Sequence, residues 1–307
     1  MPSTWLVPEG LEGERLDAAA ARITGLSRSR IEALIADGAV SVDSRLVAKS
    51  ERVRAGELLE IALDEAANTL SVVPSEVAGI EIVYDDADIV VVDKPAGVAA
   101  HPSLGWDGPS VVGHLAAAGF RISTSGAAER QGIVQRLDVG TSGLMVVAKS
   151  ETAYTVLKRA FRSRTVEKTY QTLVQGHPDP FEGTIDAPIG RHPGADYKMA
   201  VVAGGRRAVT HYSMLEAFRS TTLLQVGLET GRTHQIRVHM QAIRHPCVGD
   251  PTYGGDPVLA AKLGLDRQWL HAVRLGLVHP TRNEPMVFTS KLPDDLAAAL
   301  FQVRHNS

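Results

Sequence analysis

Segments typical of β-strands dominate the chain from about residue 79 onwards, and they do not alternate strictly with helical segments. Helical periodicity is clear at residues 110–119 and 151–163. Strand patterns are more numerous and cover residues 81–86, 88–95, 143–149, 168–176, 208–215 and 222–230. A doubly wound nucleotide-binding fold needs regular strand–helix alternation, so this order argues against it. The pattern predicts an α+β fold around a mixed, mainly antiparallel sheet.

A smaller unit precedes this domain. Two stretches with helical spacing of apolar residues come first, and the second ends at Asp37-Gly38, where glycine favours the end of a helix. Short strand-like alternation follows, and then a polar stretch that contains a proline. The sequence therefore predicts a small α/β unit at residues 14–63, a linker at 64–78 and a large domain at 79–307.

The composition limits the class of protein. With 307 residues, 44% of them hydrophobic and 22% charged, the chain can bury a sizeable core. Because the formal net charge is −3, any surface that attracts nucleic acid must be a local one. The single cysteine, Cys247, rules out a disulfide within the chain and a thiolate metal cluster. No long apolar run and no signal-peptide pattern occur, so we expect a cytoplasmic protein that does not enter a membrane, and a monomer.

One turn carries much of the functional information. Asp138 lies in the stretch QRLDVGTSG (residues 135–143), with Arg136 before it and the apolar run LMVVA after it. This arrangement places a carboxylate at the edge of a sheet. Such a carboxylate can act as a nucleophile or a base if it is held ionised and away from bulk water. Taken alone, an aspartate in a turn more often bonds its own backbone, so Asp138 needs support from other residues.

Three further polar clusters lie in the large domain, at Asp93-Lys94-Pro95, at Glu167–Tyr170 and at Glu229–His239. Each has an ordinary structural explanation when taken singly. His234 and His239 are five residues apart, so they do not share a helix face as a metal-binding pair would. No carboxylate or cysteine completes a ligand set, and we expect no metal.

The N-terminal stretch ERLDAAAARITGLSRSRIEALIADGAVSVDSRLVAKSERVRAGELLEI resembles the small RNA-binding domain first described in ribosomal protein S-four. By composition alone, its scattered charges would be a solvated surface. The resemblance implies instead that the second helix and the β-turn after it contact RNA, through Arg28, Arg30 and Arg45.

The large-domain clusters together resemble the RluA/RluD family of pseudouridine synthases, whose core signature runs H-R-L-D-x-x-T-S-G-L. Lys94-Pro95, the Asp138 turn, the Lys168–Tyr170 segment, the stretch GRTHQIR (residues 231–237) and Leu270-His271-Ala272 follow in the family's order. The chain departs from the pattern at two positions. Gln135 stands where the family usually has histidine, and Asp93, which could pair with Lys94, stands where asparagine is common.

The resemblance implies roles for individual residues. Asp138 is the implied catalytic aspartate, Tyr170 the aromatic residue packed on the target base, and Arg232 the arginine paired with Asp138. Thr233 could cap a helix that presents His234 and Arg237 on one side. The residues that we expect to bind the substrate or the surrounding RNA are Lys94, Arg136, Thr141, Gly143, His234, Gln235, Arg237, Arg162 and Arg164.

The two resemblances together imply a pseudouridine synthase that modifies specific uridines of large-subunit (23S) ribosomal RNA. The isomerisation neither gains nor loses an atom, so no cofactor is expected. Three different functions also remain open at this point. They are an enzyme of the same class that acts on transfer RNA, a catalytically silent RNA-binding or ribosome-assembly protein, and a nucleoside or glycoside hydrolase in which Asp250 or Glu229 would be the second acid.

Overall fold

The computed structural model describes residues 3–24, 28–62, 72–103, 106–126 and 130–305 of the chain. It divides the chain into two compact units, Met1–Thr69 and Leu70–Ser307. Part of the predicted linker, residues 64–71, lies outside the described residues. Residues 75–77 pack on the second unit, because Ser75 N donates to Gly113 O (3.1 Å) and Val77 N donates to His114 Nδ1 (3.1 Å).

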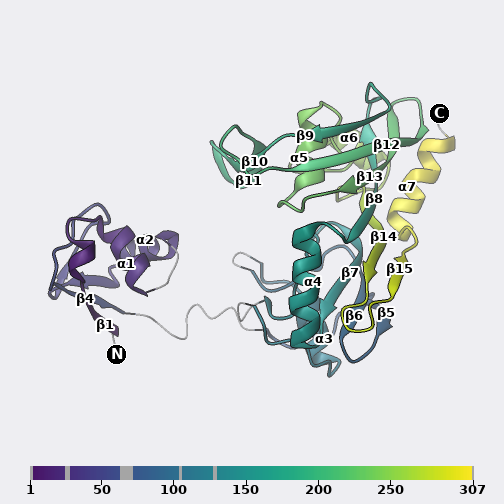
Figure 1. The fold of residues 1–307 in the computed structure, drawn as a ribbon. Coiled ribbons are helices and arrows are strands. Elements are labelled where there is room, and N and C mark those ends of the chain that lie inside the picture. Colours follow the sequence, from purple (N-terminus) through teal and green to yellow (C-terminus); the bar gives the residue numbers. More distant parts are fainter. Residues whose placement is uncertain (1–2, 25–27, 63–71, 104–105, 127–129, 306–307) are drawn as a thin grey trace. The chain divides into compact units, whose positions relative to one another are not determined.

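The N-terminal unit joins two helices to a four-stranded antiparallel sheet with strand order β1-β4-β2-β3 (Figure 1). Its elements are β1 (Ser3–Leu6), η1 (Glu9–Leu11), α1 (Leu16–Thr24), α2 (Arg28–Ala36), β2 (Val40–Val42), β3 (Arg45–Leu46) and β4 (Leu58–Ile61). Both predicted helices are confirmed. The unit begins earlier than the predicted residue 14, because β1 pairs with β4 and Val7 and Leu11 belong to its core.

The second unit is built on a nine-stranded mixed sheet with the order β5-β6-β7-β14-β8-β13-β12-β9, and β15 also pairs with β14. Its β7–β14 pair is parallel and its other strand pairs are antiparallel, which confirms the predicted α+β fold. The elements of this unit are β5 (Glu81–Asp85), β6 (Ile89–Lys94), α3 (Val111–Ala117), β7 (Ser142–Ala148), α4 (Glu151–Ser163), β8 (Glu167–Gln175), β9 (Glu182–Asp186), β10 (Ile189–His192), β11 (Ala195–Val201), β12 (Val209–Ala217), β13 (Thr221–Leu228), α5 (Gln235–Ala242), α6 (Pro257–Lys262), β14 (Leu270–Val278), β15 (Pro285–Thr289) and α7 (Asp294–His305).

Helices cover both faces of the sheet. Successive side chains of a strand point to opposite sides, so one strand can pack against helices on both faces. Val90 and Val92 of β6 pack with α3, whereas Ile89 and Val91 pack with α4. In the other half of the sheet, Tyr170 and Val174 share a core with α5, and Leu173 shares one with α7. Because helices cover both faces, every residue of the largely apolar strand β7 is buried.

The helix termini follow local rules. Ser150 caps α4 by accepting a hydrogen bond from Ala153 N, and Arg164 ends the helix in the left-handed conformation (φ 62°).

A separate two-stranded hairpin, β10–β11, lies beside α5 (Figure 1). Among the described residues, no helix is long and apolar enough to cross a membrane.

Candidate active site

The strand order brings distant motifs together at the middle of the sheet. β14 lies between β7 and β8, and its residue His271 is paired with Ser142 on one side and with Gln171 on the other. The start of β7 and the residues next to Tyr170 therefore lie in the same row of the sheet. Because the Asp138 turn leads directly into β7, it is held close to β8.

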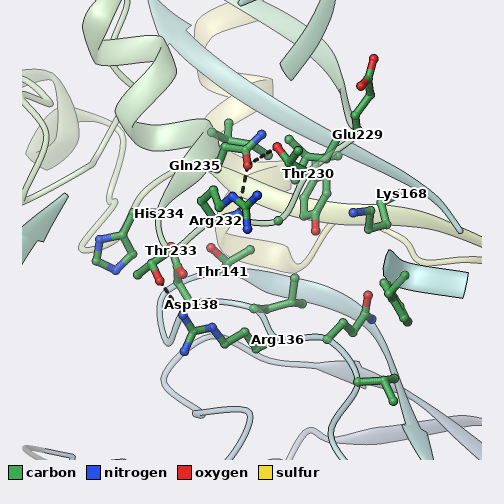
Figure 2. Close-up of a pocket in the computed structure, with 18 of the residues that line it drawn as sticks. Arg136, Asp138, Thr141, Lys168, Glu229, Thr230, Arg232, Thr233, His234 and Gln235 are labelled. Carbon is green, nitrogen blue, oxygen red and sulfur yellow. Dashed lines mark hydrogen bonds between the residues drawn. The ribbon is translucent and has the colours of Figure 1, made fainter. Parts of the chain in front are cut away.

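A cavity of about 560 Å³ opens at this place (Figure 2). It is lined by Asp138, Tyr170 and residues from α4, β13 and the start of α5. Two acidic side chains, Asp138 and Glu229, face a larger set of basic ones. The basic residues are Arg130, Arg136, Arg162, Arg164, Lys168, Arg232 and Arg237. A chain with a net charge of −3 thus concentrates positive charge in one concave place, as a nucleic-acid site requires.

Asp138 is held by an arginine that is itself fixed from behind. Arg237 Nη1 donates to Asp138 Oδ2 (3.2 Å), while its Nε and Nη2 donate to the two oxygens of Asp250 at 2.7 and 2.8 Å. The Asp250 side chain is fully buried and that of Arg237 is 7% exposed, whereas that of Asp138 is 24% exposed. Burial opposes the charge of Arg237, but the bonds to Asp250 and the charge of Asp138 outweigh it and raise the arginine's pKa. Of the two carboxylates, Asp138 is thus the one that is open to the cavity.

The pairing of Asp138 with Arg232 is wrong. The Arg232 side chain donates from Nε to Arg207 O (2.9 Å), and the structure shows no bond from it to Asp138. Along the chain, the helix α5 begins between the two arginines. Arg232 precedes the helix in an open turn, whereas Arg237 is in its first turns and points into the protein. Arg232 still lines the cavity and adds to its positive charge.

Tyr170 forms one wall of the cavity, and 7% of its surface is exposed. Burial and the negative charge of Asp138 together raise the pKa of its hydroxyl well above the ordinary value. The phenol therefore stays protonated at neutral pH. Its flat ring beside Asp138 suits the packing of an aromatic base.

The turn before α5 is organised by Gln235. Its Oε1 accepts hydrogen bonds from Thr230 Oγ1 (2.8 Å) and Arg232 N (3.0 Å), which Figure 2 shows. Its Nε2 donates to Val209 O and Thr210 Oγ1. With all these bonds made inside the protein, Gln235 shapes the turn and is not free to bind the substrate as predicted.

Thr233 does not cap α5. His234 occupies the cap position, with a left-handed backbone (φ 56°) and no side-chain cap. The Thr233 hydroxyl instead accepts a hydrogen bond from Arg136 (Figure 2). This bond ties the Asp138 turn to the turn before α5. His234 lines the cavity, and its role in binding the substrate stays a prediction.

Two residues predicted to bind the substrate, Lys94 and Thr141, form their hydrogen bonds on the side of the Asp138 turn that faces the protein interior. Lys94 is completely buried, and its Nζ donates to Pro95 O (2.9 Å), Val98 O (2.8 Å) and Val139 O (3.4 Å). Burial lowers its pKa to about 7. Thr141 borders the cavity but is 2% exposed, and its Oγ1 accepts a bond from Gln268 Nε2 (3.1 Å). Lys94 therefore supports the turn from behind, and the Thr141 hydroxyl is tied to the protein.

Gly143 also lies behind the turn. A Cβ atom there would lie 2.4 Å from Ala272 O, and its φ of +115° is one that side chains rarely adopt. The glycine lets β7 approach β14 closely, and it is not part of the cavity wall, so it does not bind the substrate as predicted. Asp93 does not pair with Lys94 either, because neighbouring strand residues point to opposite faces and Asp93 accepts a bond from Ser290 Oγ.

The outer part of the cavity carries the predicted RNA contacts Arg162 and Arg164. Arg164 Nη1 lies 3.1 Å from Glu229, which also accepts a bond from His211 Nε2 (3.0 Å). Lys168 has no acidic partner among the described residues, and burial lowers its pKa to about 8. Figure 2 places Lys168 and His234 on opposite sides of the site.

The remaining predicted RNA contacts belong to the N-terminal unit. Arg45 is an exposed residue of β3 and forms an ion pair with Glu51. Arg28 and Arg30 belong to α2, but their side chains lie outside the described residues. Gln135 lines the cavity of the second unit, and its Nε2 lies 3.4 Å from Leu144 O.

The sequence did not predict that Arg267 and Gln268 bind the Asp138 turn, or that Asp250 anchors Arg237. Arg267 is fixed to Asp295 by two bonds (2.6 and 2.9 Å), and its Nη1 donates to Gly140 O (3.1 Å). The one signal in the sequence was a polar pair, Arg267-Gln268, shortly before the apolar start of β14. Within the described residues, no three side chains of the His, Cys, Asp or Glu type are grouped so that they could hold a metal ion.

Fold and site together define an enzyme that holds a carboxylate in a basic, aromatic-walled cavity at the centre of a mixed sheet. The family model for RNA pseudouridylate synthase matches residues 88–242. A protein of Mycobacterium bovis described as an uncharacterized RNA pseudouridine synthase is 58% identical, with 96% of each chain covered. The ribosomal large subunit pseudouridine synthases D of Nitrosomonas europaea and Pseudomonas aeruginosa are 43% and 41% identical, covering 97% and 98% of this chain and 87% and 95% of theirs.

A solved structure shows the same fold. Human RNA pseudouridylate synthase domain containing 4 has a TM-score of 0.57 and 28% sequence identity, covering 73% of this chain and 93% of the human one. The chain therefore belongs to the RluA/RluD family of RNA pseudouridine synthases, and it is an isomerase that converts uridine in RNA to pseudouridine.

Proposed function

We propose that this enzyme modifies specific uridines of large-subunit ribosomal RNA, with Asp138 as its nucleophile. The observation that carries the proposal is the Asp138–Arg237–Asp250 arrangement. It presents one carboxylate to a basic cavity and buries the other.

The reaction breaks the bond between ribose C1′ and uracil N1, turns the base, and forms a bond from C1′ to C5. C5 then loses its proton, N1 ends with a proton, and the bond formed to Asp138 is broken again, so that no atom is gained or lost. An anionic nucleophile suits the first step, and the guanidinium of Arg237 holds and orients the Asp138 carboxylate. A guanidinium cannot lose its proton at neutral pH, so it holds this role through the whole reaction.

The base has to leave its stack to reach Asp138, which opposes binding by a few kcal/mol. The ring of Tyr170 offers an aromatic surface that replaces part of the lost stacking. Lys168, Arg162 and Arg164 provide positive charge on the outer side of the cavity for the flanking phosphates. Because Tyr170 stays protonated, its hydroxyl is a donor while the base is being bound.

Two observations support ribosomal RNA as the substrate. Relatives with 38–43% identity are named ribosomal large subunit pseudouridine synthase D. In addition, the N-terminal unit has the predicted α/β architecture, with the basic residue Arg45 exposed. We propose that this unit binds RNA, and that the enzyme is a monomer.

A glycoside hydrolase and a silent RNA-binding protein both fit the site less well. A glycoside hydrolase needs a second acid that can exchange protons with its substrate. Asp250 is fully buried and bonded twice to Arg237, and Glu229 is engaged by Arg164 and His211. A silent RNA-binding protein would not need the buried charge pair that orients Asp138.

The mechanism is tested with Asp138→Asn, assayed by tritium release from RNA that contains uridine labelled at C5. We expect a loss of at least about 10⁴-fold, as is usual when a nucleophile is removed. Asp186→Asn, which changes an exposed carboxylate on β9, serves as the control and should keep its activity. Equal activity of Asp138→Asn and the parent would refute the mechanism.

The substrate is tested separately by mapping pseudouridines in cells with and without the gene. Loss of one or more sites in large-subunit ribosomal RNA is the expected result. If the sites that disappear were in transfer RNA alone, the substrate would be wrong while the enzyme class stood.

A further inference from the structure

Tyr253 contacts three parts of the active site at once, although it is 1% exposed and not part of the cavity wall. Its hydroxyl lies 2.7 Å from His234 Nδ1 and accepts a hydrogen bond from Met199 N of β11 (2.9 Å). Its ring lies under the guanidinium of Arg237, with 4.9 Å between Arg237 Cζ and the ring centroid. Its backbone N–H donates to Asp250 Oδ1 (3.0 Å).

These bonds determine where the Tyr253 proton lies. Met199 N can only donate, so the tyrosine oxygen must accept from it. Among the described residues, the other polar atom next to this oxygen is His234 Nδ1. A buried hydroxyl that fails to donate is destabilising by about 1–3 kcal/mol. The phenol therefore donates to Nδ1, and burial raises the pKa of Tyr253, which keeps that proton in place.

Because Nδ1 accepts this hydrogen bond, the protonation of the other ring nitrogen of His234, Nε2, is also determined. Burial lowers the pKa of this histidine, so the ring is neutral, and with Nδ1 as acceptor its single proton is on Nε2. Nε2 has no partner in the part of the chain that the structure describes, and His234 lines the cavity. The left-handed backbone of His234 and the edge-on contact with Tyr253 (centroids 5.5 Å apart) hold the ring in one orientation.

We propose that Tyr253 is a positioning residue of the active site. Its hydroxyl fixes His234 as the Nε2–H tautomer, which donates a hydrogen bond to an oxygen of the RNA bound in the cavity. Its ring supports Arg237 in the orientation that holds Asp138. The inference rests on the proposed function, because it places the reacting RNA beside Asp138.

The aromatic contact and the hydroxyl can be separated by mutation. Tyr253→Phe keeps a ring under Arg237, since a cation is attracted to the face of phenylalanine as well, and removes only the hydroxyl. Tyr253→Leu removes both. Tyr212→Phe is the matched control, because Tyr212 is also a buried tyrosine and its hydroxyl donates to Pro180 O (3.2 Å), outside the cavity.

The first measurement is the protonation pattern of the histidine ring. Long-range ¹H–¹⁵N spectra of the full chain labelled at histidine should show His234 as the Nε2–H tautomer in the parent and in Tyr212→Phe. In Tyr253→Phe, the Nδ1–H tautomer should become substantially populated. A protein in which Tyr253 only fills space would show no change of tautomer.

The second measurement is kinetic. With RNA substrate, kcat/KM should fall about tenfold in Tyr253→Phe, as expected for one lost hydrogen bond, and further in Tyr253→Leu. Tyr212→Phe should stay within about twofold. In a His234→Asn background, where the left-handed backbone is tolerated, Tyr253→Phe should add little, because both changes remove the same bond.

An unchanged tautomer in Tyr253→Phe, or equal kinetics of Tyr253→Phe and Tyr212→Phe, would overturn the inference. So would full additivity of the Tyr253 and His234 changes. These failures are distinct from a failure of the proposed function, which shows as an active Asp138→Asn whatever the tautomer of His234.

Discussion

The Asp138 turn has two sides that carry similar residue types but differ in environment. On the cavity side, Asp138 and Arg237 form an ion pair whose carboxylate is open to solvent. On the opposite side, three donors reach the turn from inside the protein. They are Lys94 on Val139 O, Arg267 on Gly140 O and Gln268 on Thr141 Oγ1. We refer to Lys94, Arg267 and Gln268 as the backing cluster.

The comparison shows why polar residues of one motif serve different purposes. A charge that faces the cavity can stabilise or attack a substrate. A charge in the backing cluster binds carbonyl oxygens of the turn, and so it fixes the direction in which Asp138 points. Effective catalysis depends on such fixed geometry, because small displacements of a reacting group are costly. Mutations on the two sides should therefore differ in kind as well as in size.

Apart from the loss of Asp138 itself, the largest effect is expected for Arg237→Lys, on the cavity side. An ammonium group cannot bond both oxygens of Asp250 and Asp138 at once, so Asp138 loses its orientation. Activity in tritium release should fall about 1,000-fold, or about 4 kcal/mol in the barrier. Arg232→Lys is the control, and it should lose no more than a few-fold. If the two variants were equally impaired, the pairing seen in the structure would not be the functional one.

The next largest effect is on the free energy of unfolding, and it separates two glycines, Gly143 and Gly231. Gly143→Ala should lower the free energy of unfolding by about 3 kcal/mol, because its Cβ would collide with the Ala272 backbone and its φ is positive. Gly231 lies on the cavity wall, and a Cβ there meets nothing within 4 Å, so Gly231→Ala should change stability by less than about 1 kcal/mol. Urea unfolding, followed through the buried Trp269, measures both. A stable Gly143→Ala protein would contradict the close packing of β7 on β14.

The smallest effect concerns Lys94 and its pH dependence. Its pKa is about 7 in the folded protein and 10.5 in an ordinary lysine. Below pH 7 the amine is charged in both states, and between these values the unfolded chain binds more protons. Stability should therefore rise with pH in this range.

From pH 7 to pH 9, the parent should gain about 2 kcal/mol relative to Lys94→Met, since one pKa unit corresponds to about 1.4 kcal/mol. The measurement is urea unfolding of both proteins at each pH. Parallel stability curves would show that burial does not lower the pKa of Lys94 in the folded protein.

Several elements could be predicted because their patterns are local. The apolar run of β7 and the amphipathic pattern of α4 follow from the spacing of neighbouring residues, and both are confirmed. Asp138 could be singled out because its turn lies directly before a strand. The N-terminal extension of the small unit could not be predicted, because β1 is stabilised by pairing with β4, more than fifty residues away.

The arginine that pairs with Asp138 shows the same limit within a single motif. Arg232 and Arg237 are five residues apart, and both suit a carboxylate equally well in chemical terms. The choice depends on α5, which begins between them and turns Arg237 towards Asp250. Asp250 itself gave little signal, since a lone aspartate before Pro251 is also typical of an ordinary turn.

The sequence by itself determined the fold class, the family and the position of the candidate carboxylate, because these depend on local patterns and on ordered motifs. Only the tertiary structure decided which side of the Asp138 turn each polar residue occupies. Lys94 and Gly143 lie behind the turn because β6, β7 and β14 pack closely there, and this burial depends on residues far apart in the chain. The direction in which a side chain points is set by what packs around it, and the order of residues in a motif does not contain that information.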